Sequence, residues 1–116
     1  MPIPEKRNIA IFMAAYPATW GLLWVASHGS IAWALLAAWA FAFVNHTPFS
    51  LMHEAVHGVF SPNRARNNFF GTLSAPAFPT SFTLQKIAHL GHHRRNRTDE
   101  ELYDYHLPNQ SKFLRN

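Results

Sequence analysis

Hydrophobic and uncharged residues dominate the first half of the chain. No Lys, Arg, Asp or Glu occurs between Asn8 and His53, and this stretch contains two apolar runs, at residues 9–26 and 31–52. As a helix, the first run would be roughly 27 Å long, close to the hydrocarbon thickness of a bilayer. The residues between the runs, 27–30, read Ser-His-Gly-Ser, which is typical of a turn. The pattern predicts a helical hairpin that spans a membrane twice.

The second half of the chain is more polar and contains shorter helical patterns. Residues 64–75 form a short amphipathic pattern, and Pro76 and Pro79 then predict a break. Ser81 is suited to cap a further helix at residues 82–93. The sequence contains no strand pattern, internal repeat or low-complexity segment.

These patterns together predict an all-α integral membrane protein. A two-span hairpin, with spans at about 9–26 and 31–52, is followed by interfacial and cytoplasmic helices in an arm at 53–116. We expect the chain, 1–116, to be a single partial domain. A buried helix pair in a soluble core is disfavoured because too little polar sequence surrounds the runs. A signal peptide is disfavoured because the second apolar run follows the first almost at once.

Charge indicates the orientation of this hairpin. Lys6 and Arg7 precede the first span, and six arginines follow the second, five of them within residues 64–97. Because cytoplasmic flanks are enriched in Lys and Arg, we expect the N-terminus and the arm to be cytoplasmic, and the compact architecture favours a bacterial inner membrane. Such flanks account for the net charge of +4, so nucleic acid is not an expected partner, and the absence of Cys excludes disulfides and thiolate metal sites. The five arginines within residues 64–97 are Arg64, Arg66, Arg94, Arg95 and Arg97.

Five of the eight histidines fall into two short groups. His53 and His57 are four residues apart, so both imidazoles project from one face of a helix. On a helix, the rings of His89, His92 and His93 would lie within an arc of about 100°. Neutral imidazoles suit Zn, Fe, Cu or Ni. Since four ligands fill the shell of one zinc ion, five imidazoles indicate two metal ions or a larger cluster.

The first group, with Glu54, also matches the HExxH signature of zinc proteases, in which the Glu is the general base. A metzincin would continue with Gly and His at two positions that hold Phe60 and Asn63 here. Another zinc protease would need a carboxylate ligand from a different helix, and the later carboxylates all lie in the polar arm. The second histidine group has no function in such a site, so a zinc protease is the least favoured interpretation.

The two groups resemble the histidine boxes of the membrane fatty-acid desaturase and hydroxylase superfamily. The resemblance covers residues 31–108 and rests on HExxHG at the end of a span, HxxHH about thirty residues later, and an Arg-rich continuation. In that family the boxes ligate two iron ions, which activate O₂ to attack a C–H bond of a lipid acyl chain within the bilayer. Electrons come from a ferredoxin, rubredoxin or cytochrome b5-like donor. The resemblance implies no catalytic residue beyond the metal ligands, which would be His53, His57, His89, His92 and His93.

Desaturation of a fatty-acyl chain is the reaction that this resemblance implies first. Hydroxylation or ketolation of an alkane, sterol or carotenoid is the alternative, because the same boxes serve all of these reactions. Family members also carry a third histidine box, whereas the remaining histidine of this chain after the second group, His106, stands alone. We therefore expect an N-terminal fragment that is inactive unless another polypeptide supplies the missing ligands. A non-catalytic membrane fragment is the alternative from another class.

Three further features have two interpretations each. His46 lies seven residues before His53, where it could line a pocket, although an ordinary interfacial histidine is the favoured interpretation. Glu54 could orient a ligand imidazole through a hydrogen bond or be a solvated helix residue. The uncharged, Phe-rich segment 69–84 could help to wall an acyl channel or simply connect two helices.

Overall fold

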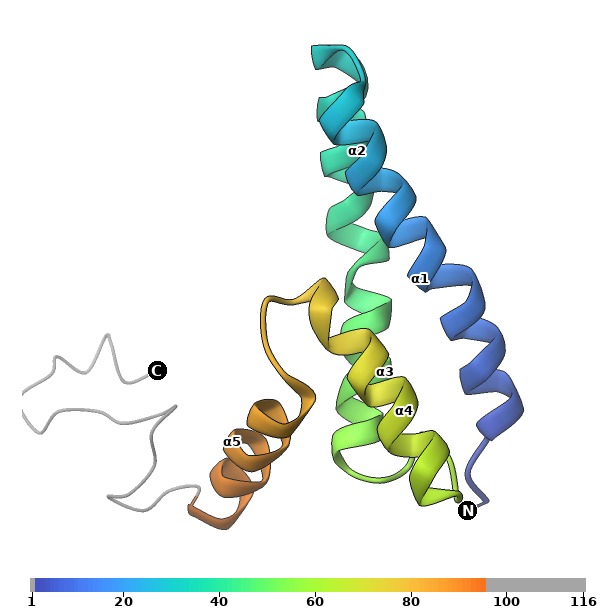
Figure 1. Ribbon diagram of the computed structural model, residues 1–116, viewed down its shortest axis with the longest axis vertical. Helices are drawn as coiled ribbons and strands as arrows, with labels where there is room; N and C mark the ends of the chain where they lie inside the picture. The colour runs from blue at the N-terminus through green and yellow to red at the C-terminus, as the bar shows by residue number, and fades with distance from the viewer. Residues whose placement is uncertain (1, 96–116) are drawn as a thin grey trace, which may run out of the picture.

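The computed structural model describes residues 2–95, and every regular element in this part of the chain is helical (Figure 1). Helices α1 (Glu5–His28) and α2 (Ile31–Val44) form a long hairpin and pack side by side. The turn between them is tight: a Cβ on Gly29 would lie 2.7 Å from the Val25 carbonyl oxygen and 2.9 Å from Cβ of Trp33. Only glycine therefore fits this turn without a shift of the helices. The predicted all-α hairpin is confirmed.

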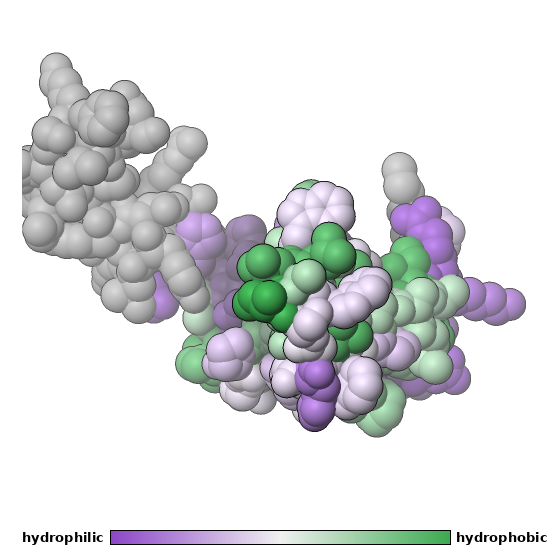
Figure 2. All heavy atoms as spheres, turned by 90° about the horizontal axis from the view of Figure 1, so that it is seen from above, coloured by the Kyte–Doolittle hydropathy of each residue, from purple (hydrophilic) through white to green (hydrophobic). Residues whose placement is uncertain are grey.

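The hairpin exposes most of its apolar surface. The segments Glu5–His28 and Ile31–Val56 are long and apolar enough to cross a membrane, and only 11% and 22% of their most apolar windows are buried. Helices in the core of a soluble protein would be mostly buried, so this exposure matches the predicted contact with lipid. The face seen from the closed end of the hairpin is mainly hydrophobic or weakly polar (Figure 2). The exposed large side chains include Trp24, Trp33, Leu35, Leu36, Trp39 and Phe43.

The second predicted span, 31–52, consists of two consecutive helices, α2 and α3 (His46–Val56). Regular helix is interrupted at Asn45, three residues before Pro48. Proline has no N–H, so the Val44 carbonyl lacks its usual helical partner four residues later. The backbone nevertheless stays close to helical at Asn45 (φ −64°, ψ −24°), so α3 continues in nearly the same direction as α2 (Figure 1).

The arm folds back onto α3 as α4 (Arg64–Ser74), the short 3₁₀ helix η1 (Ala75–Ala77) and α5 (Phe82–Arg95). Both arm helices begin with side-chain caps, as the sequence indicates for α5. The Arg66 amide donates to Asn63 Oδ1 at 3.0 Å, and the Leu84 amide donates to Ser81 Oγ at 3.1 Å. The predicted break falls at η1 and the residues after it. Arg97, the single His106 and the end of the predicted polar arm lie outside the described residues.

A small core holds the arm against the hairpin. Its buried side chains come from α1, α3, the loop after α3, the start of η1 and the start of α5. Gly71 of α4 lies against the ring of Phe82, which is 7% exposed, and no local sequence pattern predicts this contact. The core therefore fixes α5 beside the C-terminal end of α3. Its members are Phe12, Leu51, Met52, Ala55, Val56, Phe60, Ala75 and Phe82.

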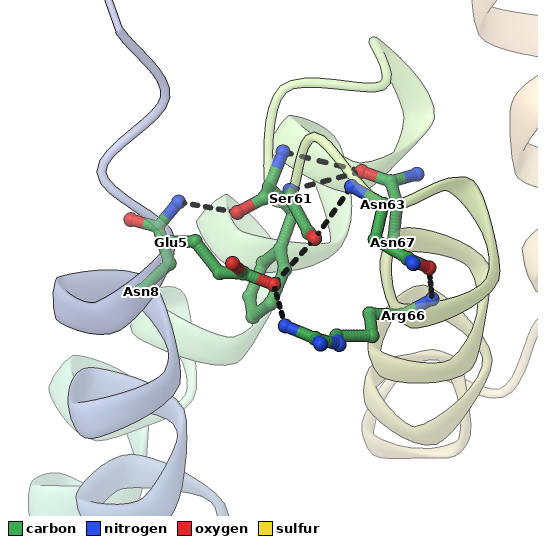
Figure 3. Close-up of polar contacts among 7 residues, drawn as sticks. Glu5, Asn8, Ser61, Asn63, Arg66 and Asn67 are labelled. Carbon is green, nitrogen blue, oxygen red and sulfur yellow. Dashed lines mark hydrogen bonds and ion pairs between the residues drawn. The ribbon is translucent and has the colours of Figure 1, made fainter.

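Polar contacts tie the start of α1 to the arm at this same end of the molecule (Figure 3). Glu5 accepts a hydrogen bond from Ser61 Oγ at 2.6 Å and pairs with Arg66 at 3.1 Å. Asn8 Nδ2 donates to the Phe60 carbonyl at 3.0 Å. The charged N-terminal residues and the arginines of α4 thus lie at one end of the hairpin, opposite the turn at Gly29.

Candidate metal centre

Four imidazoles from the two predicted groups meet between the end of α3 and the last turns of α5. His57 Nε2 lies 2.9 Å from His89 Nε2, which also lies 2.9 Å from His93 Nε2. The ring centroids of His53 and His89 are 4.5 Å apart. One ligand nitrogen from each of His53, His57 and His89 can be chosen so that all three lie within 4.8 Å of one another.

His92 lies at the edge of this cluster. Its ring centroid is 5.6 Å from that of His93 and 6.3 Å from that of His89. The fold therefore brings all five predicted ligand residues close together, although the first and the last, His53 and His93, are 40 positions apart in sequence. Their role as metal ligands stays a prediction.

Local backbone structure explains why His57 can reach the cluster. It follows the last residue of α3, and its amide still donates to the His53 carbonyl at 3.2 Å. Gly58 then adopts φ +76°, and the amides of Gly58 and Val59 donate to the carbonyls of Ala55 and Glu54 at 3.1 and 2.9 Å. This pair of bonds is a Schellman motif, which ends a helix with a left-handed residue. The glycine of the HExxHG pattern thus turns the chain directly after His57.

The chemistry of the cluster fits a metal ion. Two nitrogens bound to one metal at about 2.1 Å are roughly 3.0 Å apart at a right angle and about 3.4 Å apart at the tetrahedral angle. The observed 2.9 Å separations are close to the first value. Such a nitrogen pair forms a hydrogen bond only if one nitrogen carries a proton and the other does not. A metal cation between the rings would take the place of that proton and could accept the lone pairs of several imidazole nitrogens at once.

Electrostatics also favours neutral rings, which are the form that binds metal. Partial desolvation within the cluster lowers the pKa of His57 although its side chain stays partly exposed; the neighbouring His53 and His93 lower the pKa further, while Glu54 opposes them. Burial likewise lowers the pKa of His89, with smaller contributions in the same direction from the other four histidines. The two rings closest to the middle of the cluster therefore resist protonation.

A sequence model described as fatty acid desaturase matches residues 29–115, which is well over half of the chain and includes both histidine groups. The chain belongs to the fatty acid desaturase family. Comparison with curated proteins and comparison with solved structures gave no match. Family membership confirms the resemblance drawn from the histidine boxes, makes the chain a member of a family of oxidoreductases, and implies a lipid substrate.

A small pocket opens beside the histidine cluster of this desaturase family member. Phe49, which lines it, packs edge-to-face on Phe78 with ring centroids 5.2 Å apart. Phe78 belongs to the Phe-rich segment 69–84, so this segment supports one wall of the pocket from behind. The pocket measures only about 30 Å³, so it has room for one small group next to the candidate metal ligands and not for a whole hydrocarbon chain. The lining residues are Phe49, Met52, His53, Val56, Gln85 and His89.

The structure adds detail for Glu54 and His46. Glu54 is exposed, and within residues 2–95 no hydrogen bond joins its carboxylate to an imidazole. Its role in orienting a ligand stays a prediction. His46 is also exposed and lies outside the three-histidine metal group; its Nδ1 is 3.4 Å from Ser50 Oγ. Whether His46 lines a pocket or is an ordinary interfacial histidine stays a prediction.

Sequence reasoning missed one residue next to the cluster, Asn67. It is 3% exposed, and its carboxamide bonds the backbone on both sides of the turn that follows His57. A signal was present, because Asn67 precedes Phe70 and Gly71 by three and four positions on the inward face of α4. A polar residue on the buried face of an amphipathic helix needs hydrogen-bond partners.

Proposed function

We propose that this protein takes part in the O₂-dependent desaturation of a fatty-acyl chain at a centre of two iron ions. The ligands would be His53, His57, His89, His92 and His93. The observation that carries the proposal is the convergence of both histidine groups beside an apolar pocket in a chain of this family. O₂ is the co-substrate, and a ferredoxin, rubredoxin or cytochrome b5-like protein is the electron donor.

The reaction balances as follows. Two hydrogen atoms leave adjacent carbons of the acyl chain, a C=C bond forms, and O₂ is reduced to two molecules of water with two electrons and two protons from the donor side. The iron pair, when bound, supplies the oxidising power for this step. The imidazoles of the chain hold the metal, and the low pKa values of His57 and His89 keep those two rings in the ligand form.

The pocket would position the hydrocarbon. Phe49, Met52 and Val56 offer an apolar lining, while His53, Gln85 and His89 form the polar side of the pocket. This arrangement would bring a methylene group next to the metal without a charged anchor in the pocket. The acyl substrate would enter from the bilayer.

The membrane placement is part of the proposal. The exposed apolar hairpin would span the bilayer, with the N-terminus and the histidine boxes on the cytoplasmic side, in a bacterial inner membrane. The ties from Glu5 and Asn8 to the loop after α3 support this placement, because they hold the basic N-terminal flank and the basic arm at one end of the hairpin. The hairpin and arm would act as one domain.

Mass spectrometry of acyl lipids, with and without O₂, tests the reaction in cells that express the protein together with a polypeptide that supplies a third histidine box, because the chain alone is expected to be inactive. The proposal predicts O₂-dependent products that lack two hydrogens and disappear with His89→Ala. Products that gain an oxygen atom would favour the hydroxylase or ketolase alternative. A peptidase activity that needs zinc and survives without O₂ would contradict the proposal.

A further inference from the structure

The turn that carries His57 has little packing of its own. His57, Gly58 and Val59 are all exposed, and the contacts of the His57 ring are with other histidines of the cluster. The position of this imidazole therefore depends on the backbone of the turn. Contacts that hold the backbone of this turn in place therefore also determine the position of the His57 imidazole.

Asn67 of α4 closes the turn from outside. Its Nδ2 donates to the Ala55 carbonyl at 2.8 Å, before the turn. Its Oδ1 accepts from the amides of Phe60 and Ser61 at 3.2 and 3.4 Å, after the turn. One buried carboxamide thus bridges the two ends of the segment in which His57 lies. In Figure 3 the Asn67 side chain points from α4 toward this loop.

Asn8 of α1 holds the same segment from the other side. Its Nδ2 donates to the Phe60 carbonyl at 3.0 Å, across 52 positions of sequence. Phe60 is fully buried, and its ring stacks on Phe70 at a centroid distance of 4.9 Å. The peptide groups on both sides of Phe60 are therefore held by side chains from two different helices (Figure 3).

We infer that Asn67 and Asn8, the loop clamp, are positioning residues for the metal ligand His57. Among the described residues, neither side chain is hydrogen-bonded to the imidazole; each holds the backbone from which the imidazole projects. The inference rests on the proposed metal-binding role of His57. Groups that orient a ligand from outside the coordination sphere commonly change metal affinity by about 10- to 100-fold when they are removed.

Titration of the detergent-purified chain with Co²⁺, followed by its visible absorption, tests the loop clamp. We expect Asn67→Ala to weaken binding by about tenfold or more and to change the shape of the absorption bands, because the ligand is then held in several orientations. Asn8→Ala, which leaves Asn67 in place, should show a smaller loss in the same direction. Far-UV circular dichroism reports whether each variant keeps its helices.

Asn63→Ala is the matched control. It removes the same side chain only four residues away, and with it the hydrogen bond from the Arg66 amide, but no contact to the peptide groups around Phe60 or Ala55. We expect its Co²⁺ affinity and spectrum to remain those of the wild-type chain. An equal loss in Asn63→Ala and Asn67→Ala would overturn the inference, because it would show a general effect of weakening α4.

His57→Ala separates this inference from the proposed function. If His57→Ala binds Co²⁺ as the wild-type chain does, both the metal role of His57 and the loop clamp are wrong. If His57→Ala loses affinity while helical Asn67→Ala keeps it, the inference alone is wrong. Should Asn67→Ala fail to fold, Asn8→Ala decides: wild-type affinity and spectrum in that variant would overturn the loop clamp.

Discussion

The contact between Gly71 and Phe82 determines where α5 lies, and with it the second histidine group. In Gly71→Ala the new Cβ would lie 2.6 Å from Cζ and 2.8 Å from Cδ2 of the Phe82 ring, and would also overlap Cε2. Since carbon atoms normally approach to about 3.5–4.0 Å, the ring must move by roughly 1 Å. Phe82 begins α5, two helical turns before His89. We therefore expect α5 to shift away from α4, which changes the position of His89 relative to the histidines of α3.

The magnitude follows from two opposing effects. Overpacking of a filled core costs about 1–3 kcal/mol, whereas Ala gains about 1 kcal/mol over Gly in a helix interior. The net loss in unfolding free energy is then about 0–2 kcal/mol, too wide a range for the single variant to decide. A double-mutant cycle with Phe82→Leu removes this ambiguity, because the propensity gain is the same in both backgrounds.

The assay is thermal or denaturant unfolding of the detergent-solubilised chain, with Co²⁺ affinity measured in parallel. Gly71→Ala and Phe82→Leu should compensate each other by about 1 kcal/mol or more, and the double variant should regain metal affinity that Gly71→Ala loses. Gly21→Ala is the control, since a Cβ there meets no atom within 4 Å. Additivity of the two changes within about 0.5 kcal/mol would refute the reasoning.

Two further predictions concern the turn and the histidines. Gly58→Ala should lower the unfolding free energy by about 1–2 kcal/mol, because φ is +76° there and the added Cβ meets no atom within 4 Å; an unchanged melting temperature would contradict this. In the metal-free chain, the lowered pKa values of His57 and His89 mean that the unfolded state binds protons more readily. Stability should therefore fall as pH drops below about 6.5 and be unaffected by these two groups above it, as melts between pH 5 and 8 would show. Changing both residues to Ala should flatten the profile, and a chain that gains stability on acidification would contradict the prediction.

The hairpin and both histidine groups could be predicted because each depends on local pattern. The uncharged runs, the turn at Gly29 and the spacing of His53 and His57 all follow from neighbours in sequence. The start of α1 was predicted less well. The apolar run begins at residue 9, but the helix begins at Glu5. Charged residues such as Lys6 and Arg7 can end the membrane-spanning part of a helix without ending the helix itself. The interruption at Asn45 is a consequence of Pro48, whose effect falls on residues before it.

The supporting contacts of the candidate centre could not be predicted, because they join residues from different helices. Asn67 and Asn8 meet the loop after α3 only once α1 and α4 have packed against it. The fit of Gly71 to Phe82 likewise depends on the approach of α4 and α5. Sequence spacing shows which imidazoles share a helix face; tertiary packing decides that the two groups face each other.

Iron content is the most direct test of the central claim, that the two histidine groups form one metal centre. The detergent-purified chain would be loaded with Fe²⁺ without O₂, freed of excess metal and subjected to elemental analysis, together with His89→Ala and His46→Ala. His89 lies at the middle of the cluster and His46 outside its three-histidine group, so the two changes are matched in chemistry but not in position. We predict iron in the wild-type chain and in His46→Ala, and its loss in His89→Ala. Wild-type iron content in His89→Ala, or binding of zinc that His89→Ala does not affect, would contradict the account.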